Sequence, residues 1–530
     1  MCLLAAAACL PLACKTPDEL REEADREVYQ LIRERRASLE FGEEIFTIEP
    51  NPDSLRERIT RGEVTELPPL TLETTLLLAA ANSRDFQSQK ERLYLAALDL
   101  TLARWRFAPQ GSGLFAASAS DFGSSQTGAT SGTAGLDKLF GTGAQILSDI
   151  GLSFARDLST GDGWSAITDI GLTITQPLMR GGRIAVTENL TQAERTLAYE
   201  VWTYERFRRT FAVDVASRLY RLAQQRNAVE NEVQNSKSLA QLREKNEALA
   251  QAGRLSEIQV DQARQNELSS LDRLLTVRQR FSDQLDELKF FLGLPVEFTL
   301  DIDHEILDRL VEAGAKPHGW EPAVAVQVAR MERLDYRAQN GRLEDAERRI
   351  GVAADALRAG LDMTLNLDLS STDGKPLDFD FDDATWSLAG VLDLPINIRE
   401  ERNAYRAAIV SAEVAKRNKQ QLDDRIAADI RASLRSLTAR RESYDIQVGA
   451  VRLAERRVES ARLNLDAGRS ETRDLLEAQA ALLGAQNAAT GALIDYALAE
   501  LELYRDMELL RVGPDGIELV EAPASEGMDE

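Results

Sequence analysis

The segment Ala252-Gly253-Arg254-Leu255-Ser256-Glu257 interrupts a long stretch of helix-forming residues, and Ala467-Gly468-Arg469-Ser470-Glu471 interrupts a second stretch in the same way. An alanine follows the glycine at the same spacing in both segments, as Ala263 and as Ala478. Glycine adopts most easily the left-handed backbone with which many helices end. Each segment is therefore predicted to be the tip of a helical hairpin.

Prolines mark the limits of the two helical stretches. None occurs between Pro177 and Pro295, and none between Pro395 and Pro514. Because a proline inside a helix costs about 3 kcal/mol, these tracts predict two very long helical regions. A helix over Arg183–Ala252 would be about 105 Å long and must pack beside other long helices. Its apolar residues recur on one face, as Phe207, Phe211, Val215, Leu219, Leu222, Val229 and Val233.

Strands are predicted before each helical tract. Gly171–Pro177 and Gly390–Pro395 each end in proline, and Leu361–Leu369 alternates strictly between apolar and polar residues. Such alternation is typical of the wall of a membrane barrel. Gly113–Asp121 and Gly143–Phe154 both qualify as the first strand, and the segment between them reads equally as a loop. A soluble sandwich is less favoured, because so few strands would leave exposed edges.

The two halves of the chain repeat one order of elements. A helix carrying Arg84-Asp85-Phe86 precedes the first strands, and one carrying Leu334-Asp335-Tyr336 precedes the second. Each half then reads helix, two strands, long helix, turn, helix. The predicted organisation is an export signal over 1–14, a charged extension outside the main body over 15–69, a first repeat over 70–295, a second repeat over 296–512 and an acidic tail over 513–530.

The N-terminus predicts export. Residues 1–13 form an apolar run that is too short to span a bilayer but fits the core of an export signal. A small residue directly before Cys14 resembles a lipobox, so Cys14 is predicted to carry a lipid. A plain export signal cut nearby is the alternative. No other stretch approaches about 18 apolar residues, so any membrane span must be built from strands.

Composition excludes several functions. The formal charge of −24 argues against nucleic acid as a partner. The chain after Cys14 has no cysteine, which excludes a disulfide framework and cysteine-ligated metal there. The acidic segments Asp301–His304 and Asp378–Asp383 lack the ligand spacing of metal sites and are interpreted as solvated loops. We expect no catalytic residue, metal or cofactor, and the protein is not predicted to be an enzyme.

Taken together, the motifs resemble those of the TolC-like outer-membrane efflux proteins over about residues 70–512. The likeness rests on Gln176-Pro177-Leu178, Gly181-Gly182-Arg183, both Ala-Gly-Arg turns and the aligned alanines. The resemblance implies a mainly α fold with membrane β: a homotrimeric duct in which each subunit gives four strands to a shared twelve-stranded β-barrel. A long periplasmic α-helical barrel would continue it.

The resemblance also implies a location and partners. Such a duct lies in the outer membrane, in contact with its lipid, and has a large periplasmic portion. It is the exit of a tripartite efflux or type I secretion system, and receives substrates from an inner-membrane transporter through a periplasmic adaptor protein. The hairpin tips, with Gly253, Arg254, Gly468 and Arg469, would contact the adaptor. The rival is a non-pore periplasmic adaptor or structural coiled-coil lipoprotein, which leaves the duplicated strands unexplained.

One site follows from the resemblance alone. Relatives ring their closed periplasmic aperture with two carboxylates in the second repeat, and the matching residues here are Asp474 and Glu477. At i and i+3 they share one face of a helix, so threefold symmetry would stack two acidic rings that favour cations. An ordinary polar helix face is the other interpretation. Gln259 and Ser470 depart from the family pattern, so the contacts that hold the tips shut are expected to differ.

Overall fold

The computed structural model describes residues 15–41, 46–49, 53–121, 126–157, 165–513 and 516–519; the predicted signal and Cys14 lie outside them. The chain divides into two compact units. The strand unit comprises residues 1–46, 92–201 and 338–420, and the hairpin unit comprises residues 47–91, 202–337 and 421–530.

The predicted duplication is present in the helices. The first half contains helices of 11, 22, 69 and 35 residues, namely α4 (Leu72–Asn82), α5 (Arg84–Trp105), α6 (Arg183–Gln251) and α7 (Glu257–Phe291). The second contains helices of 11, 22, 68 and 35 residues, namely α9 (Pro322–Glu332), α10 (Leu334–Asp355), α11 (Arg399–Asp466) and α12 (Thr472–Asp506). The long helices end within a residue or so of the expected turns, which confirms both hairpins.

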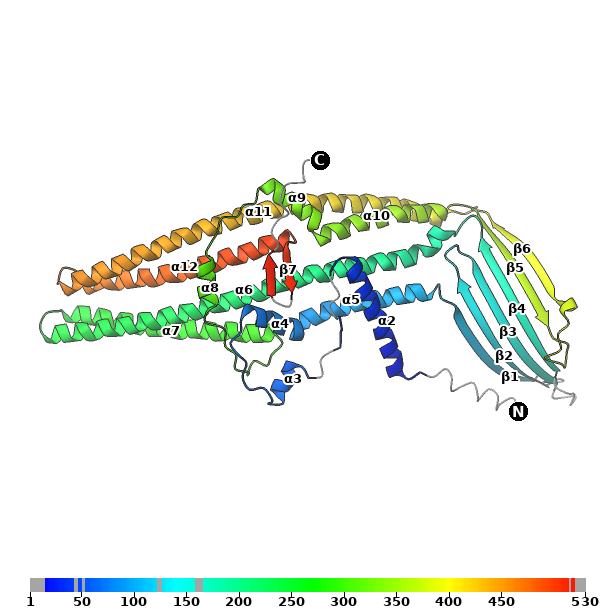
Figure 1. Ribbon diagram of the computed structural model, residues 1–530, viewed down its shortest axis with the longest axis horizontal. Coiled ribbons are helices and arrows are strands. Elements are labelled where there is room, and N and C mark those ends of the chain that lie inside the picture. The colour runs from blue at the N-terminus through cyan, green and yellow to red at the C-terminus, as the bar shows by residue number, and fades with distance from the viewer. Residues whose placement is uncertain are drawn as a thin grey trace. The chain divides into compact units, whose positions relative to one another are not determined.

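The strand unit holds one antiparallel sheet in which consecutive strands are neighbours (Figure 1). Its strands are β1 (Gln110–Asp121), β2 (Gln126–Leu139), β3 (Gln145–Asp157), β4 (Ser165–Pro177), β5 (Gly360–Ser370) and β6 (Thr385–Asp393). The expectation of two strands in the first half is wrong, because four form there. Both candidate first strands are strands, and the Gly/Ser/Thr-rich segment between them is β2, which pairs along its length with β1 and β3.

Side chains of the sheet separate into two faces. The register places Ile150 beside Ile170, and Ile170 beside Leu369, so these apolar residues lie in one row. The apolar face carries Phe115, Ala134, Leu136, Ile146, Ile150, Leu152, Phe154, Ile170, Leu172, Ile174, Leu361, Met363, Leu365, Leu367, Leu369, Trp386, Leu388 and Leu392. The opposite, polar face is rich in serine and threonine, and its acidic residues are Asp137, Asp149, Asp169, Asp362, Asp368 and Asp393. The six strands as described direct no lysine or arginine to the polar face.

The N-terminal segment is part of the strand unit. Helix α2 (Pro17–Ser38) lies in the charged extension, and the prediction that residues 15–69 lie outside the main body is wrong for this helix. Val28 and Ile32 are fully buried. The hydroxyl of Tyr94 donates to Asp25 at 2.7 Å. A short apolar stripe among many charges is enough to dock α2, because Val28 and Ile32 stand one turn apart on the same helix face.

The core of the hairpin unit forms where α9, α11 and α12 meet. Ile426, Ile430, Leu434 and Leu437 recur on one face of α11 and are at most 3% exposed. The short elements of this unit are α3 (Leu55–Thr60), α8 (Ile306–Ala313), β7 (Leu510–Gly513) and β8 (Gly516–Leu519). The acidic tail expected from 513 onward therefore begins as structured chain, because β8 pairs with β7. Among the described helices, none is both long and apolar enough to cross a membrane.

Candidate functional site

The two hairpin tips are built alike. Gly253 and Gly468 have φ of +69° and +67°, the left-handed backbone predicted for them. The amide of Arg254 donates to the Leu249 carbonyl at 2.9 Å, and the amide of Arg469 donates to the Asn464 carbonyl at 2.8 Å. Both bonds close the last turn of the preceding helix. No atom lies within 4 Å of where a Cβ would stand on either glycine, so the backbone alone requires glycine there.

Contacts between the two hairpins near these tips were not predicted from the sequence. The side-chain amide of Asn246 in α6 donates to the Thr472 hydroxyl at 3.0 Å, and both residues are buried. Lys245 forms an ion pair with Asp466 of α11. A polar residue inside an apolar stripe was the only signal in the sequence, because such a residue needs a partner when buried.

The two predicted aperture residues lie on α12 with different surroundings. Asp474 is half-buried, and its carboxylate accepts the Glu471 amide at 3.4 Å in the capping box that begins the helix. The Glu477 side chain is 60% exposed and lies 3.8 Å from both Arg457 and Arg473. These arginines supply positive charge although Ser470 carries none. Whether the pair rings an aperture stays a prediction.

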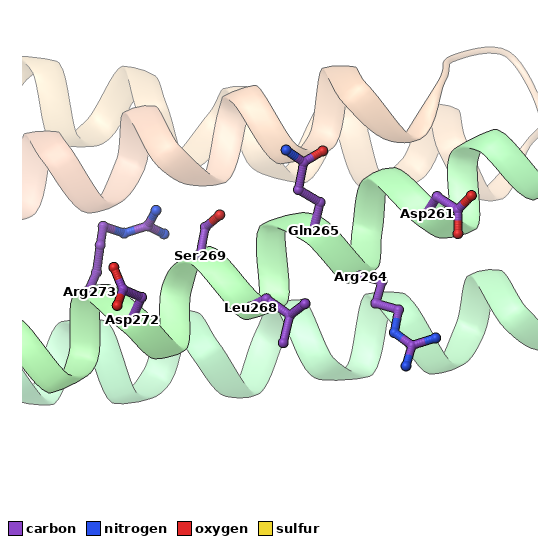
Figure 2. A pocket seen from close by; sticks show the side chains of 7 residues that line it. All are labelled: Asp261, Arg264, Gln265, Leu268, Ser269, Asp272 and Arg273. Carbon is purple, nitrogen blue, oxygen red and sulfur yellow. The ribbon is translucent and has the colours of Figure 1, made fainter.

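Helices α7 and α11 carry exposed apolar side chains. An open hollow of about 670 Å³ lies along α7. Its lining residues, drawn in Figure 2, all come from this helix: Asp261, Arg264, Gln265, Leu268, Ser269, Asp272 and Arg273. Leu268 and Leu275 are 59% and 65% exposed. On α11, Ile446 and Leu453 are 68% and 61% exposed and stand seven residues apart. Regular apolar stripes at this spacing are typical of helices that pack against another helix.

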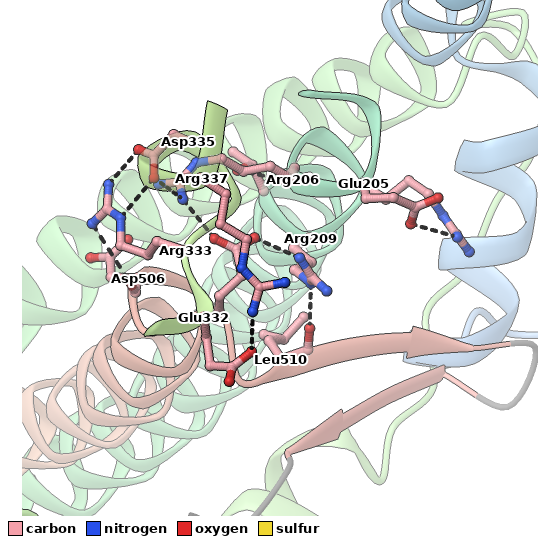
Figure 3. Close-up of polar contacts among 12 residues, drawn as sticks. Glu205, Arg206, Arg209, Glu332, Arg333, Asp335, Arg337, Asp506 and Leu510 are labelled. Carbon is pink, nitrogen blue, oxygen red and sulfur yellow. Dashed lines mark hydrogen bonds and ion pairs between the residues drawn. The ribbon is translucent and has the colours of Figure 1, made fainter. Parts of the chain in front are cut away.

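A buried cluster of ions joins distant segments of the hairpin unit (Figure 3). The Glu508 carboxylate, 2% exposed, accepts from Arg206 and from Arg209, each at 2.6 Å. Arg206 also lies 3.3 Å from Asp335, which pairs with Arg333 at 2.7 Å. The cluster thereby ties α6 to the start of α10 and to the end of α12.

Electrostatics within the Arg333–Asp335 pair of this cluster favour the charged forms of both groups. Burial alone would raise the pKa of Asp335, but the hydrogen bond from Arg333 and the charge of Arg206 outweigh it, so the pKa of Asp335 lies below its ordinary value. Both carboxylates, Asp335 and Glu508, have arginine partners. These ion pairs hold the joined segments of the hairpin unit together.

The acidic segment near His304 does not gather into a metal site. Asp303 pairs with Arg309 at 2.6 Å, and Asp301 lies 3.4 Å from Arg226. Within the described ranges, no group of three or more histidine, cysteine, aspartate or glutamate side chains is arranged to hold a metal ion.

The comparisons with known proteins rest on structure, since no family model and no curated protein matches the sequence. The Campylobacter jejuni CmeC outer membrane channel is 18% identical with a TM-score of 0.60, over 85% of this chain and 87% of that chain. The Vibrio cholerae outer membrane protein VceC is 16% identical with a TM-score of 0.61, over 82% and 95%. The Neisseria gonorrhoeae MtrE outer membrane channel in its open state is 14% identical with a TM-score of 0.57, over 82% and 88%.

At these identities the likeness shows the fold. It covers 82–85% of this chain and 87–95% of each of the three channels. The chain therefore has the fold of the TolC-like outer-membrane channels.

Proposed function

We propose that the protein is the outer-membrane exit duct of a tripartite efflux or type I secretion system. The observation that carries this proposal is a sheet with one apolar and one polar face in a chain that resembles outer-membrane channels over most of its length. Lipid would cover the apolar face, and the polar face would line the passage. The rest of the chain would extend into the periplasm. The protein would act without a cofactor and without catalysis.

The proposed assembly is a homotrimer. A sheet of six strands leaves the outer edges of β1 and β6 without a strand partner among the described residues, and the apolar stripes on α7 and α11 are exposed. Copies of the chain arranged in a ring would cover both the edges and the stripes. An adaptor protein would contact the tips at Gly253, Arg254, Gly468 and Arg469 and connect the duct to an inner-membrane transporter.

Membrane extraction tests this proposal against its rival. A duct is expected to require detergent and to run as a trimer that dissociates on heating, because its strands close only as an assembly. A structural lipoprotein without a pore would instead be released by salt or protease as a soluble monomer once the segment around Cys14 is removed. That second result would overturn the proposal.

The exposed stripe of α11 is expected to lie in the seam between subunits. Leu453→Asp places a charge in that seam and should strongly reduce the trimer fraction in detergent, because an unpaired charge is costly to bury. Sedimentation in detergent measures the trimer fraction, and circular dichroism checks the helices. Glu455→Lys is the control, since residue 455 is exposed and points away from the stripe. Equal trimer fractions for both variants would mean that the apolar stripe of α11 does not lie between subunits.

The aperture prediction concerns ion selectivity. Asp474→Asn with Glu477→Gln is expected to weaken block by multivalent cations in planar bilayers, because six carboxylates of the proposed trimer would lose their charge. Asparagine at 474 keeps an oxygen that can accept the Glu471 amide, so the start of α12 is preserved. Neutralising Glu502, another α12 acid, by Glu502→Gln is the control. Unchanged block by multivalent cations in the double variant would mean that both residues belong to an ordinary polar helix face and do not line an aperture.

A further inference from the structure

We infer that three copies of this chain close a barrel of eighteen strands, in which the outer edge of β1 in one copy pairs with the outer edge of β6 in the next. This inference rests on the trimeric duct proposed above and adds its strand number and its seam. Twelve strands were expected from the resemblance, and the first half of the chain is the reason to revise that number. The question is whether β1 and β2 belong to the wall or fold away from it.

Strand length places β1 and β2 in the wall. A tilted strand crosses the hydrocarbon core in about 9–11 residues. β1 has 12 residues and β2 has 14, compared with 9 in β6. A hairpin that only capped or plugged the barrel would not need strands of membrane-spanning length.

The register also shows no break at which this hairpin would leave the sheet. Pairing of β1 with β2 runs from Gln110 opposite Asp137 to Asp121 opposite Gln126. Pairing of β2 with β3 runs from Thr127 opposite Asp157 to Leu139 opposite Gln145. The ladder that joins the hairpin to the sheet is thus as long as any other in it.

The faces of the hairpin are in phase with the rest of the sheet. Phe115 lies opposite Gly132, and its ring is 3.8 Å from where a glycine Cβ would stand, so both lie on one face. The register carries that face on to Leu152 of β3, which is apolar. Ser131 and Ser153 are opposite each other on the other face. A wall with lipid on one side and water on the other requires the apolar residues of all its strands to lie on the same face. A hairpin surrounded by water has no such requirement.

The two edges fit one another. Six consecutive antiparallel strands leave β1 and β6 running in opposite directions, so β1 of one copy beside β6 of the next continues the antiparallel order. Unpaired backbone groups are too costly to leave in hydrocarbon, and closure is how membrane sheets avoid them. A repeated edge-to-edge contact closes into a ring when the rotation between copies is fixed. At equal strand spacing and tilt, the circumference is about one and a half times that of twelve strands, which suits bulkier cargo.

Disulfide cross-linking in the full-length protein tests this seam, because the chain has no cysteine after Cys14. Leu114, Ala116 and Ser118 of β1 are each changed to cysteine in combination with Ser387→Cys or Ala389→Cys in β6, all on the polar face. β1 and β6 lie at opposite ends of one chain's sheet, so a bond between them must join two copies. Oxidation is expected to give covalent trimers in at least one combination.

The matched control is Ser153→Cys with Ser387→Cys. In the eighteen-stranded arrangement β3 is internal, and this pair should not cross-link. If β1 and β2 lay outside the wall, β3 would become the edge, this pair would give the covalent trimers and the β1 pairs would not. That result overturns the inference and leaves the duct intact, whereas a detergent-independent monomer would overturn the duct itself.

A second readout decides the case if no pair cross-links. Phe115→Cys and Ala116→Cys are treated with a charged, water-soluble thiol reagent in native membranes. Residue 116 is expected to react and residue 115 to be protected by lipid. Equal reaction at both positions would mean that β1 stands in water, and the inference would fail.

Discussion

Glu508→Ala is expected to be among the most destabilising single substitutions in the hairpin unit, lowering the free energy of unfolding by about 3–5 kcal/mol. The Glu508 side chain is 2% exposed and neutralises both Arg206 and Arg209 at 2.6 Å. Without it, two guanidinium groups remain largely buried; Arg206 keeps Asp335, and Arg209 keeps only the Leu510 carbonyl among these contacts. The loss arises from the charges left behind, since a buried ion pair adds little net stability over apolar residues.

Thermal unfolding in detergent, followed by helical circular dichroism, measures this loss. The matched control is Glu305→Ala, which removes an acid that also pairs with an arginine, Arg309, at 3.2 Å, but is 71% exposed. An exposed pair contributes at most about 1 kcal/mol, so the control should unfold almost as the parent does. Similar midpoints for both variants would contradict the role given to Glu508.

Backbone conformation at Glu508 provides a further check. Its φ is +63°, in the left-handed region that costs a non-glycine residue about 1–2 kcal/mol. Glu508→Gly removes the charge but also removes this strain, so it should destabilise less than Glu508→Ala. If Glu508→Gly were more destabilising than Glu508→Ala, the left-handed backbone at residue 508 would not be strained.

Gly293→Ala is expected to cost about 2–5 kcal/mol, the sum of a left-handed backbone and an overpacked contact. Gly293 has φ of +71° and follows the end of α7. A Cβ there would stand 2.4 Å from the carbonyl oxygen of Asn82 and 3.1 Å from its carbonyl carbon. Both are main-chain atoms, so the end of α4 would have to move. The Gly293 carbonyl also accepts Arg56 at 2.7 Å, which fixes the turn from the other side.

Gly253→Ala is the matched control for this substitution. Its φ of +69° is nearly the same, and nothing lies within 4 Å of the added Cβ. It should therefore show the backbone cost alone, about 1–2 kcal/mol. The difference between the two thermal midpoints measures the clash with Asn82. Equal thermal midpoints for Gly293→Ala and Gly253→Ala would show that the end of α4 moves away from the added methyl group at little cost.

Local signals in the sequence predicted the hairpins and β5 well, whereas the strand expected over Gly390–Pro395 is β6, which begins at Thr385 and ends at Asp393. Gly253 and Gly468 end their helices as expected because a left-handed residue at a helix end depends on a few neighbouring residues. β5 was predictable because leucines and a methionine alternate with polar residues from Leu361 to Leu369. None of these features depends on residues that lie far away in the sequence.

Features that depend on distant partners were not predictable. β2 has glycine at 128, 132 and 135, and its composition is that of a loop until β1 and β3 are placed beside it. Glu508 lies 302 residues from Arg206 along the chain, and no local pattern relates them. The sequence alone does not distinguish a capping role of Asp474 from a charge at an aperture, because an acid in the first turn of a helix fits both roles.

The polar face of the sheet carries six aspartates and no fixed positive side chain from the strands as described. If this face lines a water-filled bore, mobile counter-ions must accompany those carboxylates at all times. At low salt, the conductance of the duct would then be higher than the bulk salt concentration predicts. It would approach a constant value as the salt is diluted further. At 1 M salt, where the screening length is about 3 Å, the excess would vanish. A bilayer conductance that fell in strict proportion to salt would show that the bore is not lined this way.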